Sequence, residues 1–316
     1  MPTIILDNGR LNWALVSPAI IGTWAFIVIG LERLFPYDKG QKLFRKGWFT
    51  DFFWYTLVQS YVLGLVIQAF AEFLDAKAGR PRWVADWPLW QQVILFLLVH
   101  DFYIYWFHRA QHRFPLLWRS HEAHHSVKDV DWLAGSRSHP IEIMINQSIE
   151  FVPIVLFASP ELFLVKGTID AVWGMYIHSN INVRSGPLQY VINGPEMHRW
   201  HHSAEYIGYG FNYGTKFAVW DYLFGTAHRP PRKPPGYGLD EAFPDGYFQQ
   251  IVHAFRRFDA APAAPVSTGA RLAQPASGAP VAQPASGAPV AQPEQPVIAS
   301  TSKAVAPARE STVDTR

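Results

Sequence analysis

Histidines are the residues of this sequence whose number and spacing could do chemistry. Nine of the thirteen lie in the middle of the chain: His108 and His112, His121, His124 and His125, the single His178, and His198, His201 and His202. On a helix, a step of three or four residues returns to the same face, so each cluster can direct its imidazoles at one point. Neutral imidazole is the commonest metal ligand and suits iron, zinc and copper. We therefore predict a metal centre that holds two ions.

The spacing within two clusters is repeated. HEAHHS at 121–126 and HRWHHS at 198–203 have the same histidine pattern 77 residues apart, which packing alone does not require. An isolated histidine is more often a hydrogen-bonded packing residue, but His178 stands at the end of an apolar hairpin and is included as a ligand. His100 is excluded because eight helical residues separate it from His108, a rise of roughly 12 Å. His228 and His253 are predicted to be surface residues.

Two further residues near the clusters are candidates for orienting a ligand. Asp101, Tyr105, His108 and His112 share one helical stripe. An ionisable group inside an apolar run is costly and usually functional, so Asp101 is a candidate for a carboxylate that orients a ligand histidine without binding the metal itself. The alternative is an aspartate near the membrane interface that bonds to a Tyr or an Arg. His139, in RSHP, is a candidate either for a hydrogen-bond donor to a metal ligand or for an additional metal ligand.

The composition indicates a membrane protein. Of 316 residues, 49% are apolar and 16% are charged, against about a quarter charged in ordinary soluble domains. The absence of cysteine excludes disulfides, thiolate zinc sites, cysteine nucleophiles and a self-supplied iron–sulfur cluster. A net charge of +2 is too small to indicate a nucleic-acid partner.

Apolar runs of about 20 residues are long enough to cross a bilayer as helices. Three such runs are 13–31, 52–74 and 87–107, and a helical hairpin is expected from 141–158 and 162–177. We predict an all-α, polytopic membrane bundle of about four spans, capped by a cytoplasmic helical domain that holds the histidine-ligated dimetal site. The first run lacks a basic leader and a small-residue cleavage site, so we interpret it as a retained span and not as a signal peptide.

Basic residues give the expected orientation. The segment 32–51 contains five Lys or Arg residues, whereas only Arg10 precedes the first run, so this segment is predicted to be cytoplasmic. Counting the spans then places all the clustered histidines on the cytoplasmic face of a bacterial inner membrane or of the endoplasmic reticulum.

Four regions are expected along the chain. They are 1–86 with the first membrane spans, 87–230 as the catalytic domain, 231–259 as a C-terminal extension, and 260–316 as a disordered tail. The tail is rich in Ala, Pro, Gln, Ser and Gly and repeats AQPASGAPV at 273–281 and 282–290. Such a composition buries too little apolar surface to fold.

The motifs resemble those of the fatty acid hydroxylase / sterol desaturase superfamily of integral-membrane di-iron enzymes. The matching segments are DFYIYWFHRAQH at 101–112, HEAHHS at 121–126, RSHP at 137–140, HSN at 178–180, HRWHHS at 198–203, NYG at 212–214 and WDYLFGT at 220–226. By this resemblance the nine histidines are the metal ligands. Some relatives have a further histidine a few positions after the equivalent of His178; here Asn182 occupies such a position, so Asn182, His139 or water would complete the site.

The resemblance implies hydroxylation of an unactivated C–H bond of a membrane lipid or sterol, with two iron ions, O₂ and two external electrons. Inserting oxygen into such a bond is beyond any side chain, so a metal or another cofactor must do it. The electrons would come from a separate donor of the ferredoxin or cytochrome b5 type. Desaturation of a sterol or acyl lipid, or carotenoid hydroxylation, is the alternative within the family. From a different class, a metal transporter or a structural zinc protein would also use histidines, although transporters usually place their ligands near the bilayer midplane.

Overall fold

Helices form all the regular secondary structure, and the only β-structure consists of isolated bridges, within the residues that the structure describes. This computed structural model describes residues 4–6, 9–77, 82–206 and 210–257. All of them belong to one compact unit, residues 1–270. The all-α prediction is confirmed. The tail that we predicted to be disordered, 260–316, lies outside the described residues.

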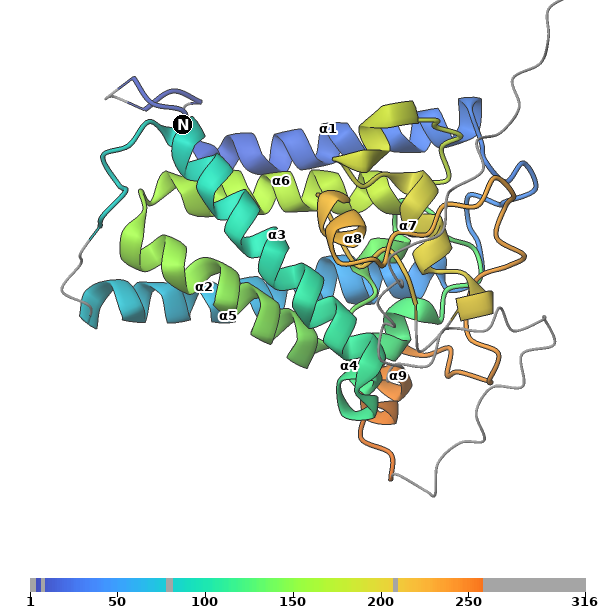
Figure 1. The fold of residues 1–316 in the computed structure, drawn as a ribbon. Coiled ribbons are helices and arrows are strands. Elements are labelled where there is room, and N and C mark those ends of the chain that lie inside the picture. Colours follow the sequence, from blue (N-terminus) through green and yellow to red (C-terminus); the bar gives the residue numbers. More distant parts are fainter. Residues whose placement is uncertain (1–3, 7–8, 78–81, 207–209, 258–316) are drawn as a thin grey trace, which may run out of the picture. The chain divides into compact units, whose positions relative to one another are not determined.

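Five long helical elements form the body of this unit (Figure 1). They are α1 (Trp13–Leu34), the π-helix η1 (Thr50–Gln59) continuing directly into α2 (Ser60–Lys77), α3 (Leu89–Arg113), α5 (Pro140–Phe157) and α6 (Glu161–His178). Each coincides within a few residues with an apolar run predicted from the sequence.

Shorter helices carry the chain between and after the long ones. They are α4 (Pro115–His125), η2 (Ala134–Ser136), η3 (Gly186–Tyr190), α7 (Pro195–His201), η4 (Ala204–Tyr206), α8 (Val219–Leu223) and α9 (Tyr247–His253). Proline stands in the first turn of α4, α5 and α7. Its fixed φ suits this position, where no N–H partner is needed, and it sets where each of these helices begins.

Two helix pairs and one crossing helix make the bundle. In Figure 1, α1 runs beside α6 and α2 beside α5, while α3 crosses and contacts both α5 and α6. A hydrogen bond of 2.5 Å between the Ser17 and Thr168 hydroxyls joins α1 to α6. Phe96 of α3 packs with Ile67 of α2 and Ile154 of α5 in a buried apolar cluster. This packing fixes where the histidine-bearing ends of α3 and α6 lie.

A buried carboxylate ties the end of α1 to two loops of the histidine region. Glu32 is 1% exposed. Its Oε1 accepts the backbone N–H groups of Trp132 and Asn180, both at 2.8 Å. Trp132 follows α4 and Asn180 follows α6, so one side chain of the first membrane helix fixes both segments.

Three helices are long and apolar enough to cross a membrane, by length and composition, within the described ranges. They are α1, the η1–α2 element and α5. The run that we predicted as the third span, now α3, is not among them because His100 and Asp101 interrupt its apolar part, and α6 contains three charged residues. By this measure three elements of the described chain are candidate spans, where about four spans were expected.

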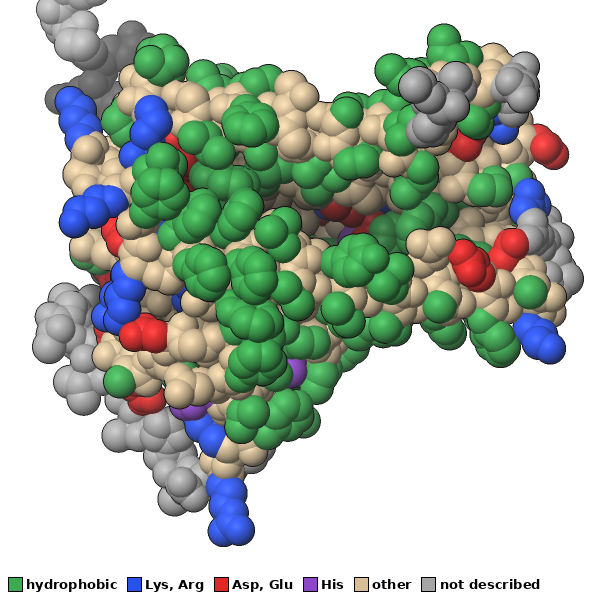
Figure 2. All heavy atoms as spheres, turned by 180° about the vertical axis from the view of Figure 1, so that it is seen from behind, with side chains coloured by type: hydrophobic (Ala, Val, Ile, Leu, Met, Phe, Trp, Pro, Cys, Tyr) green, Lys and Arg blue, Asp and Glu red, His purple; other side chains and the backbone are tan. Residues whose placement is uncertain are grey.

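The sides of these helices expose large apolar side chains. Phe26 on α1, Tyr61 and Phe73 on α2, and Trp90 and Val99 on α3 are all exposed. Figure 2 shows apolar side chains over much of one face, with the charged side chains mainly toward its two ends. A soluble protein rarely exposes so large an apolar surface. This is the surface of a membrane protein.

Candidate metal centre

The histidine-bearing segments meet at one end of the bundle. His108 and His112 lie in the last turns of α3, and the chain then reverses into α4. The corner is at Phe114, which is extended (φ −107°, ψ 120°), as the residue before a proline usually is. The C-terminal ends of α6 and α7 bring His178 and the last histidine cluster to the same place (Figure 1).

All nine predicted ligands fall into two buried groups. The five-histidine group consists of His108, His112, His121, His125 and His201, and the four-histidine group consists of His124, His178, His198 and His202. Within each group one ring nitrogen per residue lies within 4.8 Å of the others. The structure therefore brings together every histidine in the predicted set, from four separate segments, with the donor atoms that a metal ion requires.

The hydrogen bonds of the five-histidine group leave two ring nitrogens facing each other without a proton between them. His108 Nδ1 is 2.9 Å from the Tyr213 carbonyl oxygen, and His121 Nδ1 is 2.9 Å from a Glu142 carboxylate oxygen. Both oxygens accept, so both Nδ1 atoms donate, and each neutral ring keeps its lone pair on Nε2. These two Nε2 atoms are 3.0 Å apart. Two lone pairs at this distance repel each other, and a cation between them would remove the repulsion.

The four-histidine group repeats this arrangement. His124 Nδ1 donates to the Arg137 carbonyl at 3.1 Å, and His178 Nδ1 donates to the Gly174 carbonyl at 2.7 Å. Their Nε2 atoms are then both lone-pair nitrogens and lie 3.2 Å apart.

Distances between the ring nitrogens match those of ligands on a shared ion. Neighbouring Nε2 atoms within the groups are 2.8 to 3.2 Å apart. Metal–nitrogen bonds of about 2.1 Å at right angles place two ligand nitrogens about 3.0 Å apart. Both ring nitrogens of His112 and the Nε2 of His201 are also buried and have no hydrogen-bond partner among the described residues. These residues fit a metal at each group.

Burial favours the neutral form of five of these imidazoles. Removal from water, followed by the neighbouring histidines, lowers the pKa of His124, His125, His198 and His202 well below the usual value. The same burial lowers the pKa of His201 to about 3. Only a neutral imidazole has a lone pair to donate, so these groups are ready to bind a cation at physiological pH.

A loop between α7 and α8 orients two of the rings through backbone carbonyls. The Tyr213 carbonyl accepts from His108 Nδ1, and the Phe211 carbonyl accepts from His201 Nδ1 at 2.8 Å. Asp221 fixes this loop by accepting the N–H groups of Tyr213 and Gly214 at 2.7 and 2.9 Å.

Asp101 braces the same loop from α3. Its side chain is fully buried, and its two oxygens accept from the Thr215 hydroxyl, the Lys216 and Phe217 N–H groups and the Trp220 indole, at 2.7 to 3.1 Å. These partners include no histidine. Asp101 therefore holds the loop that carries the Tyr213 and Phe211 carbonyls, and the direct bond to a ligand histidine that the sequence suggested is not among its contacts.

The other two auxiliary candidates lie away from both groups. His139 uses both ring nitrogens at the start of α5: Nδ1 accepts from Ile141 N–H and Nε2 donates to the Ile251 carbonyl, each at 3.2 Å. It has no lone pair left for a metal. Asn182 is exposed, and its backbone N–H donates to the Phe35 carbonyl at 2.7 Å. Neither residue belongs to a histidine group.

A third cluster of metal-type donors already contains a cation of the protein. His100, Glu150 and Asp170 lie close together inside the bundle. Lys166 Nζ donates to all three, at 3.2, 2.5 and 2.6 Å respectively. Its ammonium group occupies the place of a metal ion, which agrees with the exclusion of His100 from the ligands.

Sequence reasoning missed Glu142 and the carbonyl acceptors. Glu142 is 6% exposed, and its bond to His121 is the carboxylate–histidine contact typical of metal sites. The available signal was a carboxylate in the first turn of a mainly apolar helix. Backbone carbonyls give no sequence signal, because every residue has one.

Comparisons with known proteins agree with this site. Residues 93–226, which contain all nine histidines, match the family model described as fatty acid hydroxylase. The ornithine lipid hydroxylase OlsE of Rhizobium tropici is 31% identical over 75% of this chain and 74% of its own length. The alkylglycerol monooxygenase of Homo sapiens is 31% identical over 50% of this chain and 34% of its own length.

Another relative is named for a sterol. The lathosterol oxidase of Homo sapiens is 27% identical over 56% of this chain and 58% of its own length. No solved structure matches the chain. The named relatives are therefore oxidoreductases of lipids or sterols.

Proposed function

The chain belongs to the fatty acid hydroxylase family, and from this premise we propose that it is a multi-pass membrane oxygenase that hydroxylates an unactivated C–H bond of a lipid. Its proposed ligands are the nine histidines of the two groups, and its proposed metal is iron, one ion in each group. The observation that carries the proposal is the pair of facing Nε2 lone pairs in each group, 3.0 and 3.2 Å apart.

A pair of iron ions bound here would supply the activation of O₂ and the insertion of one oxygen atom into a C–H bond. The protein's own contribution is positioning. Glu142 and the carbonyls of Tyr213, Phe211, Arg137 and Gly174 hold the proton on Nδ1 of five rings, which keeps Nε2 as the donor atom. All nine rings are buried, so bulk water is largely excluded from the centre.

The substrate class follows from the relatives and the surface. The ornithine lipid hydroxylase, which is matched over 74% of its own length, is named for an ornithine lipid. The exposed apolar side chains on α1, α2 and α3 would give this chain access to molecules dissolved in a bilayer. The two electrons of each turnover would come from a separate protein of the ferredoxin or cytochrome b5 type. The positive-inside pattern favours a cytoplasmic position for the histidine end.

Desaturation of the same lipid is the alternative outcome. Both reactions begin by removing a hydrogen atom from a C–H bond, and the residues described do not distinguish what the carbon does next. The product mass distinguishes them, because hydroxylation adds one oxygen and desaturation removes two hydrogens.

Metal analysis and lipid profiling of the same preparations test the proposal. Purified protein should contain two iron ions per chain, and membranes of cells that express it should contain a lipid product one oxygen heavier than in cells without it. Replacing His125 or His198 by Ala, one in each group, should remove the product and lower the metal content while the protein still inserts in the membrane. His253→Ala is the matched control because His253 lies on α9, outside both groups.

Three results would contradict the proposal. Product formation by both ligand variants would exclude the histidines from catalysis. One tightly bound zinc ion per group, with no change in lipids, would favour a structural site. Weakly bound, exchangeable metal would favour transport.

A further inference from the structure

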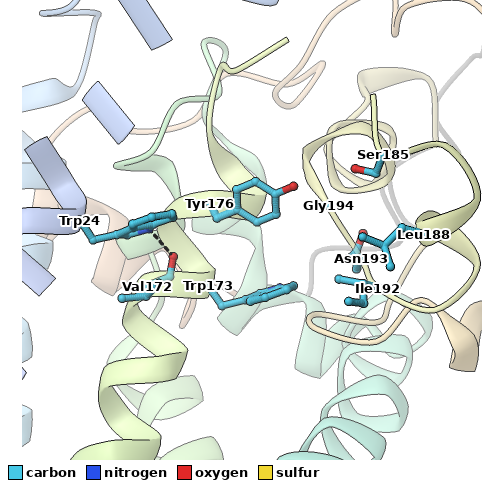
Figure 3. Close-up of a pocket in the computed structure, with 9 residues that line it drawn as sticks. All are labelled: Trp24, Val172, Trp173, Tyr176, Ser185, Leu188, Ile192, Asn193 and Gly194. Atoms are coloured by element: carbon cyan, nitrogen blue, oxygen red, sulfur yellow. Dashed lines mark hydrogen bonds between the residues drawn. The ribbon is translucent and has the colours of Figure 1, made fainter. Parts of the chain in front are cut away.

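An apolar pocket lies beside the metal centre, between α1, the end of α6 and the segment 185–194. Its volume is about 320 Å³, at the lower end of the range for small-molecule sites. In Figure 3, Trp173 and Tyr176 project from α6 toward the opposite wall, which includes Leu188, Ile192 and Asn193. The pocket is large enough for part of a lipid and too small for a whole one.

The pocket lies between α1 and two segments that carry histidines of the four-histidine group. Trp24 on its wall belongs to α1, one of the helices apolar enough to cross a membrane. Tyr176 lies two residues before His178, and Gly194 lies four residues before His198. A molecule bound in the pocket would therefore lie against two of the three segments that carry this group, α6 and the start of α7.

The walls offer hydrocarbon surface. The indole N–H of Trp24 donates to the Val172 carbonyl at 2.9 Å, and that of Trp173 donates to the Thr215 carbonyl at 3.0 Å. Since these donors are already used, the two rings offer only their apolar surfaces to a ligand. No lining residue is charged. An ionised group would lose its hydration here without gaining an ion pair, so the pocket favours an uncharged chain.

Three polar atoms at the pocket have no partner within the described part of the chain. Asn193 is fully buried; its Nδ2 donates to the Gly214 carbonyl, while its Oδ1 has no donor. No hydrogen bond is present for the hydroxyls of Tyr176 and Ser185, which lie near Gly194: a Cβ built on that glycine would be 3.4 Å from Tyr176 Oη and 3.6 Å from Ser185 Oγ. A buried acceptor without a donor is costly, so Asn193 Oδ1 indicates a ligand with an N–H or O–H group.

We propose that this pocket binds the lipid substrate by a stretch of hydrocarbon chain adjoining an uncharged amide or hydroxyl group, whose N–H or O–H donates to Asn193 Oδ1. The Tyr176 and Ser185 hydroxyls donate to an oxygen of the same group. The inference rests on the proposed function for the identity of the ligand as substrate, but binding in the pocket is measured without turnover.

Photolabelling with a matched pair of probes tests the proposal. The probes are a long-chain fatty amide with a diazirine in its chain and the methyl ester of the same chain, which keeps the carbonyl but lacks the donor. The wild-type holoprotein in lipid nanodiscs, without reductant, is labelled with each probe, and the labelled peptides are mapped by mass spectrometry. We expect label in the peptides that contain 172–176 and 185–193, with the amide about five- to tenfold more effective than the ester, as expected for one buried hydrogen bond.

Tyr176→Phe and Ser185→Ala separate the two halves of the recognition. Each removes a hydroxyl that has no partner in the described protein, so the thermal stability should not change. The double variant should lower labelling by both probes by the same factor and leave the amide-to-ester ratio unchanged. Tyr61→Phe, on the exposed side of α2, is the matched control and should label like wild type.

The outcomes separate this inference from the proposed function. Label outside the pocket, or equal labelling by amide and ester, would overturn the inference, and the oxygenase proposal would stand if the heavier lipid product still forms. Label in the pocket with the expected preference, in a protein that forms no oxidised lipid, would support the inference as a lipid site and refute the oxygenase proposal.

Discussion

Replacing Asp101 by Ala should destabilise the protein strongly, although none of the hydrogen-bond partners of Asp101 is a histidine. The carboxylate is fully buried and accepts from two backbone N–H groups, of Lys216 and Phe217, and from two side chains. The side chains can turn toward other acceptors, but the backbone groups cannot. Each buried N–H left without an acceptor costs about 1 to 3 kcal/mol, so we expect a loss of about 2 to 6 kcal/mol.

The loss should appear as a lower unfolding temperature and a lower metal content. For a domain of this size, 1 kcal/mol shifts Tm by roughly 2 to 4 °C, so Tm should fall by at least about 4 °C in tryptophan-fluorescence melts of the detergent-solubilised protein. Because the loop that Asp101 braces carries the carbonyl acceptor of His108, the five-histidine group should also bind metal less tightly. Asp129→Ala is the control, since Asp129 is exposed. If D101A had the same Tm as D129A and the wild-type protein, the proposed role of Asp101 in holding the loop would be wrong.

Three further predictions concern the environment of the histidines. In Gly135→Ala, the new Cβ would lie 2.6 Å from Nδ1 of His178, so the ring must move and metal analysis should show one ion per chain in place of two; two retained ions would contradict the geometry. Glu142→Ala removes the acceptor of the His121 Nδ1 proton and should weaken metal binding about 10- to 100-fold in a chelator competition, whereas an unchanged affinity would mean that the carboxylate does not orient the ring. Lys128 is exposed and lies only a few residues after α4. Lys128→Glu should therefore slow reduction of the protein by an acidic electron donor several-fold at low salt, and the difference should vanish at high salt. Equal reduction rates at low salt would place the docking surface of the donor elsewhere.

The sequence predicted the long helices and singled out the nine histidines that the structure brings into two groups, because both depend on local periodicity. A span is one uninterrupted apolar run, and spacings of three and four residues place ligands on one helix face whatever the rest of the chain does. His178 was less certain because it has no neighbour in sequence. It joins the centre through the packing of α6 against α7 and η2, which brings its Nε2 to 2.8 Å from His198 Nε2 and 3.2 Å from His124 Nε2.

The auxiliary residues were predicted less well because their roles depend on contacts between distant segments. His139 lies in a histidine motif, yet its ring is used to begin α5 and to contact Ile251, which is 112 residues away. Asn182 is near His178 in sequence but lies beyond the end of α6, where the chain turns outward. Glu142 was missed because its place in the first turn of a mainly apolar helix marks it as unusual but does not show which side chain it faces.

The attachment of α1 through Glu32 has a consequence for how the lipid environment acts on the protein. A membrane helix whose apolar length differs from the bilayer thickness tilts or shifts, at a cost of fractions of a kcal/mol per Å. Any such displacement of α1 would pull on the backbone of Trp132 and Asn180, and through them on the segments that follow α4 and α6. Bilayers of different acyl-chain length should therefore change the rate of the reaction even where the substrate concentration is the same.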